Sequence, residues 1–281
     1  MTRPSTKIGK VYLVGAGPGA ADLITVRGAN LLARADIVLH DALVGQEVLD
    51  LCQQAIKVAV GKRCGKLSSA QEFINKRLVD AAYKYQTIVR LKGGDPMLFG
   101  RADEEITTLK NAGIEIEVVP GITAALAGAA TIQKSLTLRG VSRSVAFITV
   151  AQGTENVSPG KTSQPLNNPS ADTLVYYMGR KDATRIAQQL IEQSPNQLGH
   201  TPVHILEAVS TARERLWTST LSELAAGKAD AWFDSGSPAL IMIGAALSNK
   251  NLVHEYLKSS SSEINDGLQN AQIFPNSRRS A

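Results

Sequence analysis

Short apolar runs recur along this chain, and many of them end in a glycine or a Gly-Pro turn. The glycine-terminated stretches read VGAGPG, VGKRCG, LKGGDP, VVPGI, YYMG and IMIG. In open α/β sheets, ligands bind outside the carboxyl ends of the strands, and glycines there let the backbone approach a ligand closely. The set therefore predicts a ligand cleft built from strand ends.

The apolar runs alternate with amphipathic stretches, which is the pattern of an α/β fold with mainly parallel strands. Expected strands cover residues 11–14, 37–39, 57–60, 87–91, 116–119, 145–150, 174–177, 203–206 and 240–243. Expected helices cover residues 22–34, 69–84, 103–112 and 182–193. We expect Ser69 and Glu72 to form a capping box at the second helix, and Gly113 to end the third in a left-handed conformation.

A break near Gly121 divides the pattern into two parts of similar style. The sequence thus predicts an N-terminal α/β domain over residues 1–121 and a C-terminal α/β domain over residues 122–250. Residues 251–281 are rich in Ser and Asn, a composition that favours a disordered tail.

Composition narrows the functional class. The 281 residues carry a net charge of +5 and two cysteines. No Lys/Arg block suggests a nucleic-acid partner, and no apolar run approaches the length of a membrane span. The N-terminus lacks the apolar core of a secretory signal, so we expect a cytoplasmic protein. His200 and His204 are separated by Pro202 and no Cys/His cluster is present, so we predict no metal site.

The stretch Gly15-x-Gly17-x-x-Ala20, followed by Asp41, fits the dinucleotide-binding fingerprint. A dinucleotide-dependent oxidoreductase is therefore one hypothesis. Pro18 removes an amide from the loop that would bind the pyrophosphate. This hypothesis also gives the segment KGGDPMLFGR no role.

A resemblance to a known family rests on motifs that follow one another along the chain. They are VYLVGAGPGAADLITVRGANLLARADIVLHDALV, VGKRCG, VRLKGGDPMLFGR, VVPGITAA, LVYYMGR and SPALIMIG. In order and spacing the chain resembles the uroporphyrinogen-III C-methyltransferases of the tetrapyrrole methylase family, from about Val11 to Gly244. The resemblance implies two α/β domains with an interdomain cleft, usually in a homodimer. It implies transfer of two methyl groups from S-adenosylmethionine to C2 and C7 of uroporphyrinogen III. The products would be S-adenosylhomocysteine and precorrin-2, the precursor of sirohaem and cobalamin, made by a stand-alone methyltransferase.

The resemblance also implies site residues. Asp41 matches the family's base and Lys62 its acid. The cofactor-binding positions fall on Pro18, Gly93, Gly94, Asp95, Leu98, Thr123, Ala124, Met178, Val209, Pro238 and Ala239. The substrate carries eight carboxylates, and we expect Arg63, Arg101, Arg139 and Arg143, with Lys62, to bind them.

These residue types suit the chemistry. Methyl transfer is a displacement at carbon that depends on alignment, and the methylated ring must then lose a proton to a base such as a carboxylate. Asp95 in its Gly-Gly-Asp-Pro turn is also typical of a residue that only forms the turn, but the neighbouring glycines favour a ligand contact. A third hypothesis is a catalytically idle member of the family that binds tetrapyrrole or cofactor without turnover.

Overall fold

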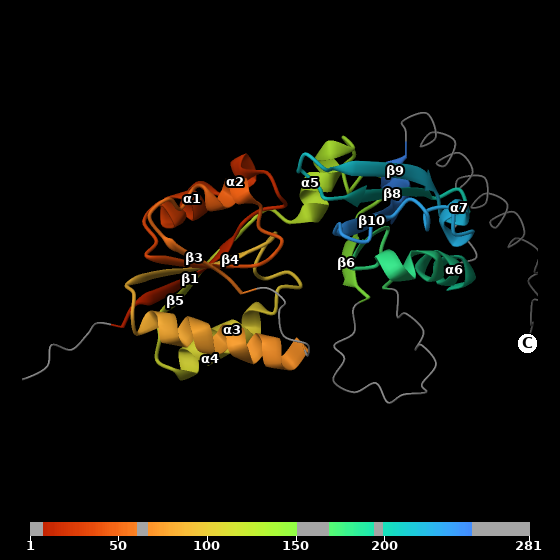
Figure 1. Ribbon diagram of the computed structural model, residues 1–281. Coiled ribbons are helices and arrows are strands. Elements are labelled where there is room, and N and C mark those ends of the chain that lie inside the picture. Colours follow the sequence, from red (N-terminus) through yellow and green to blue (C-terminus); the bar gives the residue numbers. More distant parts are fainter. Residues whose placement is uncertain (1–7, 61–66, 151–168, 194–198, 249–281) are drawn as a thin grey trace, which may run out of the picture.

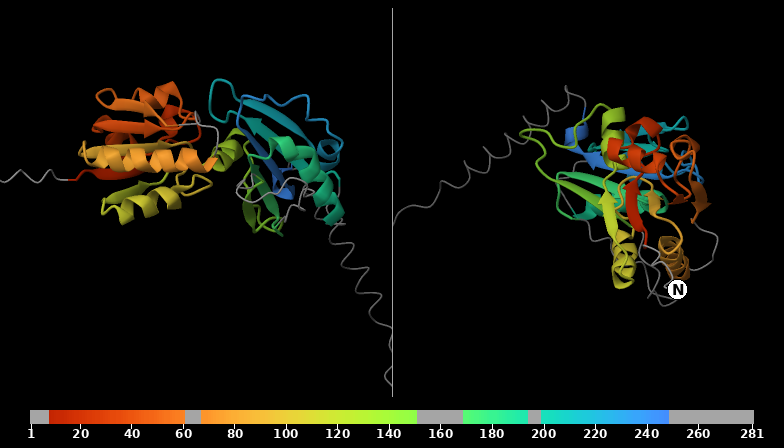
Figure 2. Two further views of the ribbon diagram at one scale, coloured as in Figure 1. Left: turned by 60° about the horizontal axis from the view of Figure 1, so that its bottom comes forward. Right: turned by 90° about the vertical axis from the view of Figure 1, so that its left-hand side faces the viewer.

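The computed structural model describes residues 8–60, 67–150, 169–193 and 199–248, which form two five-stranded sheets. We call β1–β5 with α1–α4 the N-terminal unit and β6–β10 with α5–α7 the C-terminal unit. The units lie side by side with α5 between them (Figure 1), and the views in Figure 2 agree. The boundary expected at residue 121 falls between β5 and α5. The expected tail over residues 251–281 lies outside the described residues.

The N-terminal sheet is parallel throughout, as predicted, with the order β3-β2-β4-β1-β5. Its strands are β1 (Lys10–Gly15), β2 (Ile37–His40), β3 (Ile56–Ala59), β4 (Thr87–Lys92) and β5 (Ile116–Val119). Its helices are α1 (Val26–Ala33), α2 (Gln46–Leu49), α3 (Leu67–Ala82) and α4 (Ala102–Asn111). Helices α1 and α2 cover one face, and α3 and α4 cover the other (Figure 1).

Helix ends differ from the sequence prediction in two places. The expected helix over residues 22–34 is a 3-10 turn, Ala21–Leu23, followed by α1, because Ile24 is extended and the Thr25 side chain accepts the amide of Gly28 as N-cap. Helix α3 begins at Leu67, so Ser69 lies inside it and the capping box is wrong. The left-handed end of α4 is confirmed, with a φ of +69° at Gly113.

The C-terminal sheet has the order β6-β7-β10-β8-β9. Its strands are β6 (Val145–Thr149), β7 (Thr173–Tyr177), β8 (Pro202–Glu207), β9 (Arg215–Thr220) and β10 (Ala239–Gly244). Its helices are α5 (Ala124–Thr131), α6 (Ala183–Gln193) and α7 (Leu221–Ala225), with 3-10 turns at Arg180–Asp182 and Ala245–Leu247.

The prediction of mainly parallel strands is wrong for this second sheet. Only β6 and β7 pair in parallel, whereas β10 runs antiparallel to β7 and β8, and β9 runs antiparallel to β8. A short connection of residues 208–214 joins β8 to β9, and so short a connection allows only an antiparallel pair. The sequence analysis missed β9 because its RLWTST sequence has no continuous apolar run.

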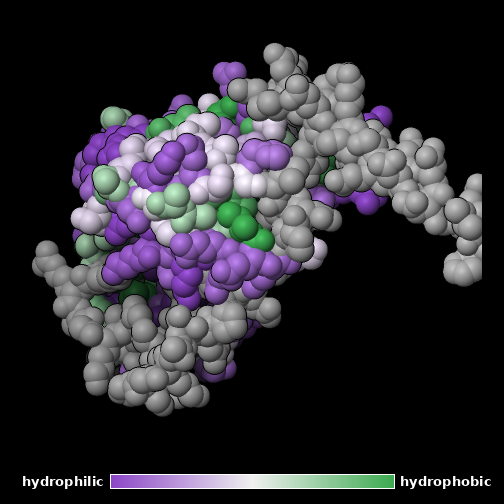
Figure 3. All heavy atoms as spheres, turned by 90° about the vertical axis from the view of Figure 1, so that its right-hand side faces the viewer, coloured by the Kyte–Doolittle hydropathy of each residue, from purple (hydrophilic) through white to green (hydrophobic). Residues whose placement is uncertain are grey.

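Side chains alternate between the two faces of each sheet, so each sheet has two apolar layers. In the C-terminal unit, α6 and α7 pack on Ile205 and Ile241, and α5 packs on the opposite face against Leu206 and Leu240. Hydrophilic residues predominate on the outer face seen in Figure 3, with hydrophobic ones in small groups. No helix in the described part of the chain is long and apolar enough to cross a membrane.

Candidate functional site

Three glycines meet where β1, β4 and β5 end, and we call Gly15, Gly94 and Gly121 the glycine junction. A Cβ on Gly121 would lie 2.2 Å from the carbonyl oxygen of Gly94 and 2.8 Å from the Cα of Gly15. A Cβ on Gly15 would lie 2.5 Å from the Cα of Gly121. Since main-chain atoms cannot yield as a flexible side chain can, only glycine fits at Gly15 and Gly121. The junction therefore brings three loops together at the carboxyl edge of the sheet.

The loops of this junction leave room for a ligand beside the backbone. Gly17 and Gly94 exchange two main-chain hydrogen bonds, of 2.7 and 3.2 Å, and both have a positive φ, of +79° and +67°. A Cβ on Gly94 would meet no atom within 4 Å. The side chains of Leu43, Met97 and Met178 are each more than half exposed. Bare backbone and exposed apolar side chains fit a small organic ligand such as S-adenosylmethionine.

Asp95 holds the junction together. Its Oδ1 accepts the amide of Met97 at 2.8 Å, and its Oδ2 accepts the amide of Gly121 at 2.8 Å. The first bond closes an Asx turn, and the second ties the loop after β4 to the loop after β5. The carboxylate thus fixes the backbone of the glycine junction, which is the turn-forming role that the sequence left open.

The loop after β1 does not offer the amides that a dinucleotide requires. The amide of Ala16 donates to Lys92, that of Gly17 donates to Gly94, and that of Ala20 donates to the Ser210 hydroxyl. Pro18 has no amide proton. Helix α1 begins only at Val26, after an extended residue, so its N-terminus does not follow the glycines directly. This geometry disfavours a phosphate cradle and hence the oxidoreductase hypothesis.

The same loop contacts the C-terminal unit. A Cβ on Gly19 would lie 2.5 Å from the Thr211 side chain and 2.9 Å from the carbonyl oxygen of Val209. The Ser210 hydroxyl accepts the amide of Ala20 at 3.1 Å. Pro18 therefore lies between Gly17, which is bonded to Gly94, and Gly19, which packs on the loop after β8.

Tyr177, at the end of β7, makes a second connection between the units. Its hydroxyl bonds with the Thr123 hydroxyl at 2.6 Å and accepts the amide of Ala125 at 3.1 Å, at the start of α5. Its ring lies 5.2 Å from the ring of Phe99, which belongs to the loop after β4. Met178 follows directly, with a φ of +55° and an exposed side chain. A methionine held in this conformation indicates local backbone strain, which is concentrated at functional sites.

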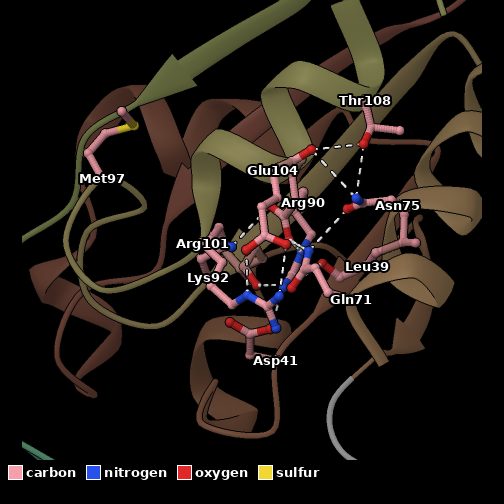
Figure 4. Close-up of polar contacts among 12 residues, drawn as sticks. Leu39, Asp41, Gln71, Asn75, Arg90, Lys92, Met97, Arg101, Glu104 and Thr108 are labelled. Atoms are coloured by element: carbon pink, nitrogen blue, oxygen red, sulfur yellow. Dashed lines mark hydrogen bonds and ion pairs between the residues drawn. The ribbon is translucent and has the colours of Figure 1, made fainter. Parts of the chain in front are cut away.

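Asp41 follows β2 and is paired with a buried arginine. Arg90 Nη2 donates to Asp41 Oδ1 at 2.5 Å, and Arg90 Nε donates to Glu105 Oε1 at 3.0 Å (Figure 4). Lys92 Nζ donates to Glu105 Oε2 at 3.0 Å, and Gln71 donates to Glu105 Oε1 at 3.4 Å. We call Asp41, Arg90, Lys92 and Glu105 the charged cluster.

Burial and charge act against each other in the charged cluster. Burial lowers the pKa of Lys92, although Glu105 partly offsets that effect. For Arg90, burial also lowers the pKa, but the charges of Glu105 and Asp41 outweigh it, so the pKa is raised. The Arg90 guanidinium is therefore charged at any pH at which the protein folds.

Hydrogen bonds and close packing connect the segments that carry all eleven predicted cofactor-binding residues. These loops follow β1, β4, β5, β7 and β8 and precede β10, where the carbonyl of Pro238 accepts the amide of Ala208. The residues on these loops or on the first position of the following element (Ala124 of α5, Ala239 of β10) are Pro18, Gly93, Gly94, Asp95, Leu98, Thr123, Ala124, Met178, Val209, Pro238 and Ala239. The segment after β2, which carries Asp41, also lies beside these loops, because a Cβ on Gly93 would touch Leu43 of that segment at 3.4 Å.

The predicted substrate-binding residues are more scattered. Arg101 lies at the start of α4 with a φ of +55°, and its guanidinium pairs with Glu104 at 2.6 and 2.8 Å. Arg139 and Arg143 are exposed on the segment between α5 and β6. Lys62 and Arg63 lie outside the described residues.

The sequence analysis missed Arg90, Lys92, Glu105, Tyr177 and Ser210. A signal for the first two was present, since two cations two residues apart in an otherwise apolar strand must share one face of the sheet. Tyr177 becomes recognisable only through its ring contact with Phe99 of the N-terminal unit, and Ser210 only through its bond with Ala20.

Two surface hollows lie away from these loops. One of about 510 Å³ is lined by α1 and β5, and one of about 230 Å³ lies beside Asp172 and β10. None of the predicted site residues lines either hollow. The chemistry of the residues, and not hollow volume, identifies the candidate site.

Comparisons with known proteins agree with this site. Residues 10–225 match the family model of the Tetrapyrrole (Corrin/Porphyrin) Methylases. A siroheme synthase of Psychrobacter sp. (strain PRwf-1) is 41% identical over 240 residues, which are 84% of this chain and 47% of that protein. The chain thus spans about half the length of the curated relatives it matches.

Solved structures extend the match. The uroporphyrin-III C-methyl transferase of Thermus thermophilus, complexed with S-adenyl homocysteine, is 36% identical with a TM-score of 0.71. The match covers 85% of this chain and 99% of the Thermus chain. A cobalt precorrin-4 methyltransferase is 27% identical with a TM-score of 0.71, over 89% of this chain and 99% of that one. The expected fold is confirmed, and the chain belongs to the tetrapyrrole (corrin/porphyrin) methylase family.

Proposed function

We propose that this chain transfers two methyl groups from S-adenosylmethionine to C2 and C7 of uroporphyrinogen III and so forms precorrin-2. The observation that carries the proposal is the match to nearly the whole Thermus methyltransferase, which was solved with the demethylated cofactor. The siroheme synthase relatives support the same substrate. The linked glycine loops support a small organic cofactor.

In this proposal the cofactor lies along the loops of both units. When bound, S-adenosylmethionine supplies an electrophilic methyl group on a cationic sulfur and leaves as S-adenosylhomocysteine. The loop backbone at Gly93 and Gly94 approaches it closely, since neither residue has a side chain and a Cβ on Gly94 would meet no atom within 4 Å. Met178 and Leu98 provide apolar walls, and Asp95 holds the loops in register through its two amide bonds.

Asp41 acts as the base. A ring carbon of the substrate forms a bond to the methyl group while the methyl–sulfur bond breaks, and the methylated ring becomes cationic. The ring then releases a proton, which Asp41 accepts. Asp41 is suited to this role because it is partly exposed, at 31% of its side-chain surface, and one of its oxygens is held by Arg90.

Cations around the site bind the substrate's carboxylates. We assign this role to Arg63, Arg101, Arg139 and Arg143, and the role of acid to Lys62, on the basis of the family match. The assignment of Arg101 is supported by its place on the loop after β4. We also propose that the protein is a cytoplasmic homodimer with no nucleic-acid or membrane partner. Light scattering of the purified protein tests whether it is a dimer.

The test is anaerobic incubation of uroporphyrinogen III with methyl-labelled S-adenosylmethionine, followed by mass spectrometry. We expect two labelled methyl groups per tetrapyrrole. Calorimetry with S-adenosylhomocysteine and with NAD(P) runs in parallel, and we expect binding of the first alone. Binding of S-adenosylhomocysteine without any methyl transfer would overturn the proposal in favour of an idle family member.

A further inference from the structure

The charged cluster lies in a layer that is otherwise apolar. Ile88, Arg90 and Lys92 share the face of β4 that packs on α3 and α4, where Leu39 and Leu109 are also buried. The side chains of Arg90 and Lys92 are 3% exposed and that of Glu105 is 0% exposed. Buried charges cost folding free energy, and apolar residues of similar volume are often as stable or more so. Such a cluster beside a reactive group is a candidate for a role in function.

Charge balance couples the cluster to Asp41. Arg90 and Lys92 carry two positive charges, and Glu105 supplies one negative charge. One positive charge is left over, and the carboxylate of Asp41 neutralises it. Asp41 is therefore the fourth member of a balanced group and not an isolated surface acid.

The guanidinium of Arg90 is held on all its sides. Nε donates to Glu105, and Nη1 donates to the carbonyl oxygens of Leu91 at 3.2 Å and Leu39 at 3.5 Å. Nη2 is left to donate to Asp41 Oδ1. Because the guanidinium is planar and each of its nitrogens is engaged, it cannot swing to follow a moving carboxylate.

The two oxygens of Asp41 therefore differ. Oδ1 is fixed by Arg90, whereas Oδ2 has no hydrogen-bond partner within residues 8–60, 67–150, 169–193 and 199–248. In Figure 4 the Asp41 carboxylate lies at the edge of the cluster, with one oxygen toward the guanidinium and the other away from it. An oxygen that is held in place and still has a free lone pair is what a general base requires.

We propose that Arg90 is a positioning residue, which fixes the Asp41 carboxylate so that Oδ2 faces the substrate, while Glu105 holds Arg90 in place. This inference rests on the proposed function, in which Asp41 takes the ring proton. Lys92 completes the charge balance around Glu105. Arg90 itself touches neither the substrate nor the cofactor.

The experiment compares Arg90→Lys, Asp41→Asn and the double variant in the full chain. A lysine keeps the positive charge but cannot reach both Glu105 and Asp41 with a planar fork. We expect Arg90→Lys to lower kcat by on the order of 10²-fold, the cost of a misplaced group, with KM and the Kd of S-adenosylhomocysteine unchanged. In the Asp41→Asn background, we expect Arg90→Lys to cause no further loss, because it acts through Asp41.

Gln71→Leu is the matched control. Gln71 is buried and bonds Glu105 from α3, but it does not touch Asp41. We expect this variant to lose stability and keep kcat. An Arg90→Lys variant that is folded and fully active, or a double variant whose losses multiply, would overturn the proposal.

A crystal structure of Arg90→Lys gives a readout that does not depend on activity. We expect the Asp41 side chain to leave its wild-type rotamer in Arg90→Lys and to keep it in Gln71→Leu. An unmoved Asp41 would overturn the positioning role. If Arg90→Lys fails to fold, Glu105→Gln replaces it, and we expect the same change at Asp41. If the wild-type protein transferred no methyl group at all, that result would instead count against the proposed function alone.

Discussion

The two units build their contributions to the candidate site in different ways. Beside the glycine junction, the N-terminal unit uses glycines where the backbone takes a positive φ, as at Gly17 and Gly94, and it places residues with side chains in this conformation farther along the loop after β4, at Phe99 and Arg101. The C-terminal unit uses residues with side chains in the same conformation, at Met178, Ala208 and Ser210. A left-handed conformation costs such residues roughly 1–2 kcal/mol each, and glycine avoids that cost.

The difference follows from what each loop does. The N-terminal loops pack main chain on main chain at Gly15 and Gly121, where a Cβ would collide with the backbone. The C-terminal loops present side chains: Met178 is exposed, and Ser210 accepts a bond from Ala20. We infer that the first unit gives the ligand close backbone and the second gives it walls and connections. The strain of the second unit is the cost of placing those side chains.

The layers beneath the loops differ too. The N-terminal layer under α3 and α4 contains the charged cluster. The C-terminal layer under α6 and α7 is mainly apolar, with residues such as Ile186, Ile205 and Ile241. Its buried carboxylate, Glu207, lies at the end of β8, where it accepts the amide of Asp234 and pairs with Arg215. Proton transfer therefore belongs to the N-terminal unit in this proposal, and the C-terminal unit supplies shape.

The largest expected effect is that of Gly121→Ala. Its Cβ would collide with the main chain of Gly94 and of Gly15, and neither can yield. We expect the free energy of unfolding to fall by about 3 kcal/mol, and the affinity for S-adenosylhomocysteine to fall by more than about 10-fold. Urea unfolding and calorimetry measure the two effects.

Gly113→Ala is the control for this prediction. Gly113 also has a positive φ, of +69°, but a Cβ there meets no atom within 4 Å. We expect a loss of about 1 kcal/mol from backbone strain and normal affinity. Equal loss of affinity in both variants would show that the junction is not special.

The next prediction compares two aspartates at opposite ends of β4 in the N-terminal sheet. Asp95 and Asp36 each accept two main-chain amides, Asp95 beyond the carboxyl end of β4 and Asp36 at its amino end. The two amides at Asp95 bind different oxygens, so the NH₂ group of an asparagine would face one of them. Both amides at Asp36 bind Oδ2, so Asp36→Ala is the substitution that removes their acceptor. We expect Asp95→Asn and Asp36→Ala each to lose about 1–2 kcal/mol of stability.

Binding is the quantity that should differ between these two variants. We expect only Asp95→Asn to weaken S-adenosylhomocysteine, by about 10-fold, because only Asp95 fixes the glycine junction. If Asp36→Ala weakened binding as much, the effect would come from general loosening of the sheet.

Sequence reasoning succeeded where one stretch of chain decides the outcome. The parallel N-terminal sheet follows from strands separated by helices, and the end of α4 follows from a single glycine. Sequence reasoning failed where the structure of a strand depends on the neighbouring strand it pairs with. The direction of β10 depends on which strands it joins, and β9 is stable because it pairs with β8.

The same limit applies to the candidate site. Glycine motifs and Asp41 can be identified from neighbouring residues alone. Arg90 looks like an ordinary strand cation until Glu105 and Asp41 are brought to it from 15 and 49 residues away. Ser210 is recognisable only once its loop meets the loop after β1.

A third prediction concerns His204, a buried histidine of β8 in the C-terminal sheet. His204 bonds the Thr218 hydroxyl through Nδ1 and donates from Nε2 to the carbonyl of Leu247, and a neutral ring with the proton on Nε2 can make both bonds. Burial lowers its pKa below the ordinary value, and Lys134 lowers it further, although the bond to Leu247 acts in the opposite direction. The unfolded chain therefore binds the proton first as pH falls.

Stability from neutral His204 is fully present above the unfolded pKa of about 6.5 and is lost as pH falls below it, toward the lower folded pKa. We expect His204→Gln to flatten this part of the pH dependence in urea unfolding. His200→Gln, a change at an exposed histidine, should keep the wild-type slope. An unchanged slope in His204→Gln would contradict the assignment.

The smallest expected effect tests the strain of the C-terminal loops. Ala208 has a φ of +48° and is 4% exposed, so it presents no side chain to the site. Ala208→Gly removes the left-handed strain but frees the unfolded chain, and we expect a net gain of about 0.5 kcal/mol. Ala127→Gly is the same substitution within α5, and there we expect a loss of about 1 kcal/mol. Opposite signs in urea unfolding would show that the C-terminal loop stores strain, and a loss in both variants would show that it does not.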